Sequence, residues 1–116
     1  MSSESDADGA SLARAYYTAI DAGDYDRLES LLAPEFVHDR PDRTIEGRDA
    51  FIEFMRSGRP LTDTTHPIEG VYTETDGAGV AVRGRLCRAD GSVITAFVDV
   101  FTVTDGRLRA LTTFTP

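Results

Sequence analysis

The stretch that decides the fold is VITAFVDVFTVTDG, residues 93–106. Successive side chains of an extended strand point to opposite faces of a sheet. One face of this strand carries Val93, Thr95, Phe97, Asp99, Phe101 and Val103, and the other carries Ile94, Ala96, Val98, Val100 and Thr102. Because both faces are largely apolar, we expect both to be covered, one by helices and the other by a second copy of the chain. The stretch therefore predicts a buried strand and a homodimer formed through the sheet.

The region around this strand predicts an antiparallel meander. Asp-Gly pairs, which are strong signals for tight hairpin turns, occur at residues 76–77, 90–91 and 105–106. They separate four candidate strands at residues 68–75, 79–88, 93–103 and 108–115. Strands gathered after a helical first half indicate an α+β domain, not a parallel βαβ sheet.

The first half of the chain has helical spacing of its apolar residues. The pattern predicts a helix over residues 11–22 that stops at Gly23, and a second helix capped by Asp24 and closed by Pro34. A short strand over residues 35–40 and a third helix from about residue 47 to residues 57–58 follow. Residues 1–10 are expected to be a disordered acidic tail, and residues 11–116 a single domain.

The charge composition indicates a salt-adapted surface. Twenty acidic residues oppose twelve basic ones, giving a net charge of -8, and every basic residue is Arg. Such acidity predicts a soluble protein of a salty, halophilic cytoplasm and argues against binding to nucleic acid. No signal peptide or apolar stretch long enough for a membrane span is present in these 116 residues. The single cysteine, Cys87, is expected to be a buried structural thiol.

Four segments resemble the NTF2-like superfamily, and within it the SnoaL-like domains related to polyketide cyclases and ketosteroid isomerases. They are YYTAIDAGDYDRL (residues 16–28), LLAPEFVHD (31–39), EGRDAF (46–51) and VDVFTVTDGRL (98–108), in the order typical of that superfamily. The resemblance implies a cone-shaped α+β barrel with three N-terminal helices packed on a curved, mostly antiparallel sheet, a deep apolar pocket and usually a dimer. It implies no single activity, because this fold carries isomerases, cyclases, dehydratases, hydrolases and binding proteins.

Asp99 is the foremost candidate for chemistry because it interrupts an apolar run. A buried carboxyl group must be protonated, hydrogen-bonded or paired, and a salt bridge to Arg83 or Arg85 is the structural alternative. By resemblance, Asp99 and Tyr16 match the protonated aspartate and the tyrosine that hold the substrate oxygen in ketosteroid isomerases. Tyr16 can equally be an ordinary core tyrosine.

The general base of those isomerases is missing from its usual place. The resemblance puts an aspartate directly before a proline at the end of the first strand, where this chain has Arg40 before Pro41. Arginine stays protonated and suits an anionic ligand group instead. Asp39 reaches the same face only if a β-bulge shifts the register, whereas His38 shares the face of Arg40. His66, before Pro67, is expected to be a loop residue.

These residues support three hypotheses. The first is an enzyme with isomerase-, cyclase- or hydrolase-type acid–base chemistry on a small apolar carbonyl compound, using Tyr16, His38, Asp39 and Asp99. The second is a non-catalytic binder of an apolar or anionic ligand, and the third is a dimeric interaction module with a filled pocket. No cofactor or metal ion is expected, because no ligand-type residues are grouped. The expected ligand-contacting residues are Phe36, Arg40, Phe54, Met55, Phe97 and Phe101.

Overall fold

The computed structural model describes residues 8–58 and 63–116 and has an α+β fold. Three helices, α1 (Gly9–Ala22), α2 (Tyr25–Leu31) and α3 (Arg48–Glu53), pack on one six-stranded sheet, and α3 continues as the π-helical turn η2 (Phe54–Gly58). The strands are β1 (Leu32–Asp39), β2 (Thr44–Glu46), β3 (Ile68–Thr73), β4 (Gly79–Cys87), β5 (Val93–Thr104) and β6 (Arg107–Phe114). Their order is β2-β1-β6-β5-β4-β3.

The predicted meander is confirmed. Strands β3, β4, β5 and β6 are neighbours in chain order and pair antiparallel, whereas β1 pairs parallel with β6. The β5–β6 turn shows why Asp-Gly was informative: Asp105 and Gly106 have φ of 53° and 76°. Those left-handed values are tolerated by aspartate and glycine and disfavoured for most other residues.

The helix ends follow from their capping residues. Asp8 accepts a hydrogen bond from the Ser11 amide at 2.7 Å, so α1 begins at Gly9, two residues earlier than predicted. Residues 1–7 of the expected acidic tail lie outside the described residues. Gly23 ends α1 at φ 69°, and Asp24 caps α2. Pro34 lies inside β1, where the register with β6 is interrupted, because proline has no amide hydrogen to give to the ladder.

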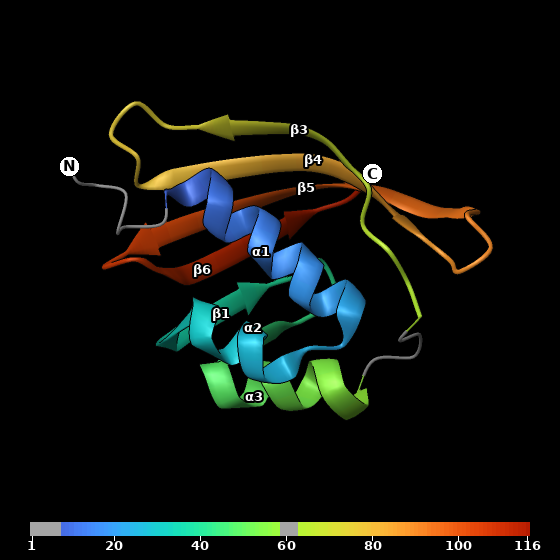
Figure 1. Cartoon of the computed structure of the whole chain (residues 1–116), viewed down its shortest axis with the longest axis horizontal. Helices are drawn as coiled ribbons and strands as arrows, with labels where there is room; N and C mark the ends of the chain where they lie inside the picture. The colour runs from blue at the N-terminus through green and yellow to red at the C-terminus, as the bar shows by residue number, and fades with distance from the viewer. Residues whose placement is uncertain (1–7, 59–62) are drawn as a thin grey trace.

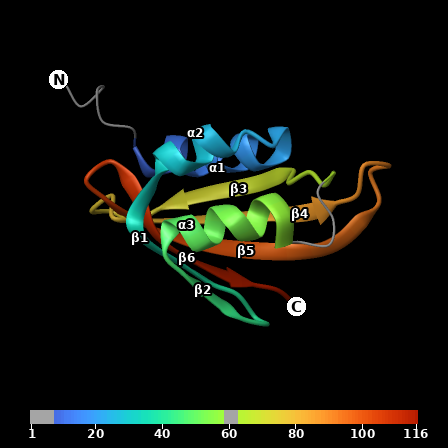
Figure 2. The ribbon, with the colours of Figure 1, turned by 90° about the horizontal axis from the view of Figure 1, so that it is seen from below.

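The helices cover one face of the curved sheet. Figure 1 shows α1 crossing the meander, and Figure 2 shows α1, α2 and α3 on the same side of it. The sheet is open, with β2 and β3 at its edges, so the cone-shaped barrel stays a prediction. No helix within residues 8–58 and 63–116 is long and apolar enough to cross a membrane.

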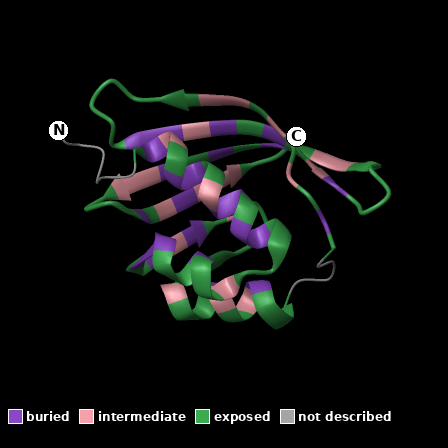
Figure 3. Ribbon diagram, viewed as in Figure 1, coloured by how far each residue is buried: buried purple, intermediate pink, exposed green. Residues whose placement is uncertain are grey.

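Burial alternates along β5, as Figure 3 shows for the sheet. Phe97, Asp99 and Phe101 are buried under the helices, whereas Val98 and Val100 on the outer face are exposed by 37% and 39%. The single chain therefore covers only one of the two apolar faces. The second copy expected on the outer face stays a prediction.

Candidate functional site

A cavity of about 410 Å³ lies between α1, the sheet and the segment before β3. This volume is in the range of small-molecule sites. Six of the predicted site residues line the cavity: Tyr16, His38, Arg40, Met55, Phe97 and Asp99. The other lining residues are Ile20, Pro41, Asp42, Thr64, His66, Leu86, Ile94, Thr95, Thr113 and Thr115.

Asp99 is held in the wall of this cavity by two hydroxyl groups. The Tyr17 hydroxyl donates to Oδ2 at 2.5 Å and the Thr113 hydroxyl donates to Oδ1 at 2.6 Å, while the residue is only 6% exposed. Burial raises the pKa of Asp99 above its ordinary value, although both hydrogen bonds act to lower it. The carboxyl group is therefore satisfied by hydrogen bonds while its charged form is disfavoured.

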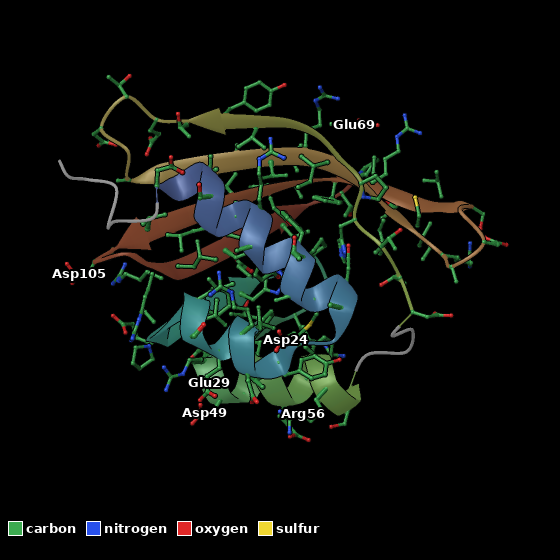
Figure 4. The ribbon with its side chains drawn as sticks, in the orientation of Figure 1. Asp24, Glu29, Asp49, Arg56, Glu69 and Asp105 are labelled. Carbon is green, nitrogen blue, oxygen red and sulfur yellow. The ribbon has the colours of Figure 1, made fainter. Side chains whose placement is uncertain are left out.

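Asp99 does not form the alternative salt bridge with Arg83 or Arg85. Both arginines project from the exposed face of β4 and bind Glu69, at 2.9 Å and 2.7 Å. Glu69 lies on β3, along the sheet edge away from α2 and α3 (Figure 4). The strand alternation thus separates these charges from the inward-facing Asp99.

His38 extends the same hydrogen-bond network. Its Nε2 lies 2.8 Å from Oγ1 of Thr113. Because the Thr113 hydroxyl hydrogen is directed at Asp99, Oγ1 accepts from His38, which assigns the Nε2–H tautomer for an ionised Asp99. Burial, followed by the charge of Arg40, lowers the pKa of His38 to about 3. His38 is therefore a neutral member of the wall at physiological pH.

The tyrosine that binds Asp99 is Tyr17, the neighbour of the candidate Tyr16. Both tyrosines face the sheet, and their rings meet edge-on with centroids 5.0 Å apart. Tyr16 packs edge-on against Phe101 at 5.2 Å and lines the cavity with its ring. Burial and the neighbouring Asp99 raise the pKa of Tyr17 far above its usual range, so its hydroxyl stays a donor. Tyr16 and Asp99 both line the cavity, and their shared role at a ligand oxygen stays a prediction.

The end of β1 places Asp39 and Arg40 on different sides. The pairing of residues 37–39 with β6 is regular, so no bulge turns Asp39 inward. Asp39 is exposed and accepts a hydrogen bond from Thr44 on β2 at 3.1 Å. Arg40 lies at the cavity rim, where it pairs with Asp42 at 3.3 Å and stacks over Phe54 at 5.0 Å. The structure therefore does not bring Asp39 into the cavity.

Three of the expected ligand-contacting aromatics do not line the cavity. Phe36 and Phe101 are fully buried in the core, where Phe36 meets Phe51 at 5.0 Å. Phe54 is half-buried beneath Arg40 and Arg43. These aromatics pack against other side chains behind the cavity wall or under its rim, so they support the cavity without lining it.

Three residues at this site were not identified from the sequence: Tyr17, Thr113 and His66. His66 lies in a loop, as predicted, but it lines the cavity and packs against Tyr17 and Phe97 at 5.4 Å and 5.9 Å. Its Nδ1 lies 2.6 Å from Oδ1 of Asp21. A usable signal was the spacing of Tyr17 and Asp21, four residues apart and hence on the same face of a helix. No group of three metal-ligating side chains occurs in the described part of the chain.

Comparisons with known proteins agree with the fold of this chain. The SnoaL-like domain model matches residues 13–111. A candidate ketosteroid isomerase from Kribbella flavida superimposes with a TM-score of 0.74 at 25% identity, covering 90% of this chain and 75% of that one. A candidate polyketide cyclase from Sinorhizobium meliloti gives 0.76 at 21%, covering 89% and 93%.

A third solved structure, an LEH-like epoxide hydrolase from M. tuberculosis, gives a TM-score of 0.77 at 18% identity, covering 90% of this chain and 80% of that one. No curated protein matches the sequence. At these identities the solved structures are alike in fold, while the domain model covers most of the chain. The chain belongs to the SnoaL-like domain family and has its NTF2-like fold.

Proposed function

We propose that the protein is an enzyme that moves protons on a small apolar carbonyl compound, with Asp99 in its acid form holding the carbonyl oxygen. The observation that carries the proposal is a buried carboxyl group in a cavity wall that is bound by two hydroxyl groups. Among the described residues it has no salt bridge. Such a group is neutral more readily than an exposed aspartate and can then donate a hydrogen bond.

The two hydroxyl groups orient the carboxyl group for this role. Tyr17 donates to Oδ2, and Thr113 at Oδ1 can either donate or accept because its hydroxyl rotates. With Asp99 protonated, its O–H is available to a ligand oxygen in the cavity. When a carbon next to the carbonyl loses a proton, negative charge develops on that oxygen, and a donor already in place stabilises it without reorganisation.

The cavity also supports an anionic substituent on the ligand. Arg40 is the cationic group at the rim, held over the Phe54 ring and paired with Asp42, whose side chain is 61% exposed. A carboxylate or phosphate group could replace Asp42 as the partner of this guanidinium. The same observation favours the second candidate function, a non-catalytic binder of an apolar anion.

A planar phenol tests the proposal, because its phenolate resembles an enolate in shape and charge. We expect 2-naphthol to bind saturably, as measured by its fluorescence, and Asp99→Ala to weaken binding roughly tenfold or more, the size of a lost hydrogen bond to a charged group. Asp39→Ala, at the exposed residue outside the cavity, is the matched control and should bind like the wild type. Equal affinity in Asp99→Ala, or no saturable binding to the wild type, would contradict the proposal.

A further inference from the structure

The loop that carries His66 is fixed to the sheet. Thr65 and Cys87 exchange two backbone hydrogen bonds, of 3.0 Å and 2.9 Å, and the Arg85 amide donates to the Pro67 carbonyl at 3.1 Å. A Cβ on Gly84 would lie 2.6 Å from that carbonyl oxygen, so only glycine permits the close approach. His66 therefore sits on a loop whose neighbours on both sides are anchored.

The imidazole itself is oriented by a carboxylate on α1. Asp21 accepts from the His66 backbone amide at 3.0 Å with Oδ2 and meets Nδ1 at 2.6 Å with Oδ1. Because an ionised carboxylate only accepts hydrogen bonds, Nδ1 must carry a proton, and in the neutral ring Nε2 is then the basic nitrogen. Nε2 makes no hydrogen bond to another described residue.

This pair lies beside the proposed acid. The His66 ring packs on Tyr17, whose hydroxyl binds Asp99, and both His66 and Asp99 line the same cavity. Among the described residues, the imidazole interacts with the titratable groups of Asp21 and Tyr17 on α1 and of Asp99 on β5. The side chains of His66 and Asp21 are 15% and 26% exposed, so the pair is shielded but not sealed from solvent.

We infer that His66 is the general base of this cavity and that Asp21 is its positioning residue, an inference that rests on the proposed function. Nε2 removes a proton from the carbon next to the carbonyl group. The C–H electron pair forms a carbon–carbon double bond, the carbonyl π electrons move to oxygen, and that oxygen takes the Asp99 proton. In a compound with a carbon–carbon double bond next to the carbon that lost the proton, the product is a dienol. His66 returns the proton to the far carbon of that double bond while Asp99 recovers its own, so the catalyst is unchanged after one isomerisation.

The other candidates for a base meet this requirement less well. His38 is neutral, but its Nε2 is engaged by Thr113 and its Nδ1 is buried without a partner among the described residues. Asp39 points away from the cavity, and Arg40 is permanently protonated. His66 alone among them combines a place in the wall with a carboxylate that stabilises the imidazolium formed during the reaction.

The probe for the base is 5-nitrobenzisoxazole, a small apolar compound whose C–H proton can be removed by any well-placed base. Removal of that proton forms a nitrile, breaks the N–O bond and releases a coloured phenolate, so the rate is read by absorbance without knowing the natural substrate. We expect His66→Gln to lower kcat/KM roughly 100-fold or more, the contribution typical of a general base. Glutamine can still donate to Asp21, so this variant keeps the loop contact while losing the basic nitrogen.

Asp21→Asn tests the positioning role. We expect kcat for the elimination to fall roughly tenfold with KM unchanged, because the imidazole keeps its place in the wall but loses the carboxylate that stabilises its imidazolium. Asp26→Asn, at an exposed aspartate on α2, is the matched control and should leave both unchanged. An unchanged kcat in Asp21→Asn, a rate in His66→Gln within threefold of wild type, or no elimination above buffer in the wild type would each overturn the inference. If 2-naphthol binding still depends on Asp99 in that event, the proposed function survives and only the assignment of the base fails.

Discussion

The two histidines line one cavity from different elements, His38 from the wall formed by the strands (the strand wall) and His66 from the wall formed by the loop before β3 (the loop wall). His38 lies within strand β1, is 6% exposed and meets a hydroxyl group at 2.8 Å. His66 lies in a loop and meets a carboxylate at 2.6 Å. Burial, followed by the charge of Arg40, keeps the first ring neutral, whereas the second ring has its Nδ1 on a carboxylate and its Nε2 unbonded by any described residue. Burial and the identity of the hydrogen-bond partner together decide which ring is suited to move a proton.

The largest expected difference between the strand wall and the loop wall is the contribution of His38 to the pH dependence of the free energy of unfolding. Its pKa is about 3 in the folded chain and near 6.5 in the unfolded one, so between these values only the unfolded chain binds the proton. The free energy of unfolding therefore falls as pH falls, by about 3 kcal/mol from this residue between pH 7 and pH 4. Urea unfolding of the wild type and His38→Gln at both pH values measures it: the variant should lack this part of the fall.

The matched control for this prediction is the other histidine. His66→Gln leaves His38 in place and should retain the fall seen in the wild type. Equal pH dependence of the wild type and His38→Gln would mean that His38 binds a proton as readily in the folded chain as in the unfolded one, and the neutral state assigned to it here would be wrong.

The fold was largely accessible from sequence because its signals are local. Asp-Gly turns at residues 90–91 and 105–106, and the Gly23-Asp24 boundary between helices, act through backbone conformations that do not depend on distant contacts. The inward direction of Asp99 followed from strand alternation in the same way. Local rules therefore predicted both the strand wall and the residue at its centre.

The remainder of the site depends on contacts between distant residues. Tyr17 and Asp99 are 82 residues apart, and Asp21 and His66 are 45 apart, so no local pattern joins them. A rotation of about 100° separates adjacent helical residues, and two adjacent tyrosines that both face a sheet cannot be ranked by periodicity alone. The resemblance singled out Tyr16 for a ligand oxygen, whereas the contact between Tyr17 and Asp99 depends on the position of β5 relative to α1.

The next largest effect is expected from the Thr113 hydroxyl, which bridges His38 and Asp99 in the strand wall. Thr113→Val keeps the shape of the side chain but leaves His38 Nε2 and Asp99 Oδ1 without their shared partner. We expect a loss of about 1–3 kcal/mol of unfolding free energy, the cost of a buried polar group left unpaired, measured in urea at pH 7. Thr112→Val, next on β6 and facing the other side of the sheet, should stay within about 0.5 kcal/mol of wild type. Similar stabilities for both variants would show that the hydroxyl does not bridge the two buried groups.

The smallest expected effect on the free energy of unfolding comes from the Asp21–His66 pair in the loop wall. The Asp21–His66 pair is partly exposed, and water can replace each partner, so a double-mutant cycle with Asp21→Ala and His66→Ala should give a coupling energy below about 1 kcal/mol. The same two residues should have the largest effects on 5-nitrobenzisoxazole elimination. A pair that matters little for folding and much for proton transfer is organised for chemistry, whereas a coupling of several kcal/mol would indicate that the carboxylate mainly holds the loop in place. The cycle, measured by urea unfolding at pH 7, therefore separates positioning for reaction from structural support.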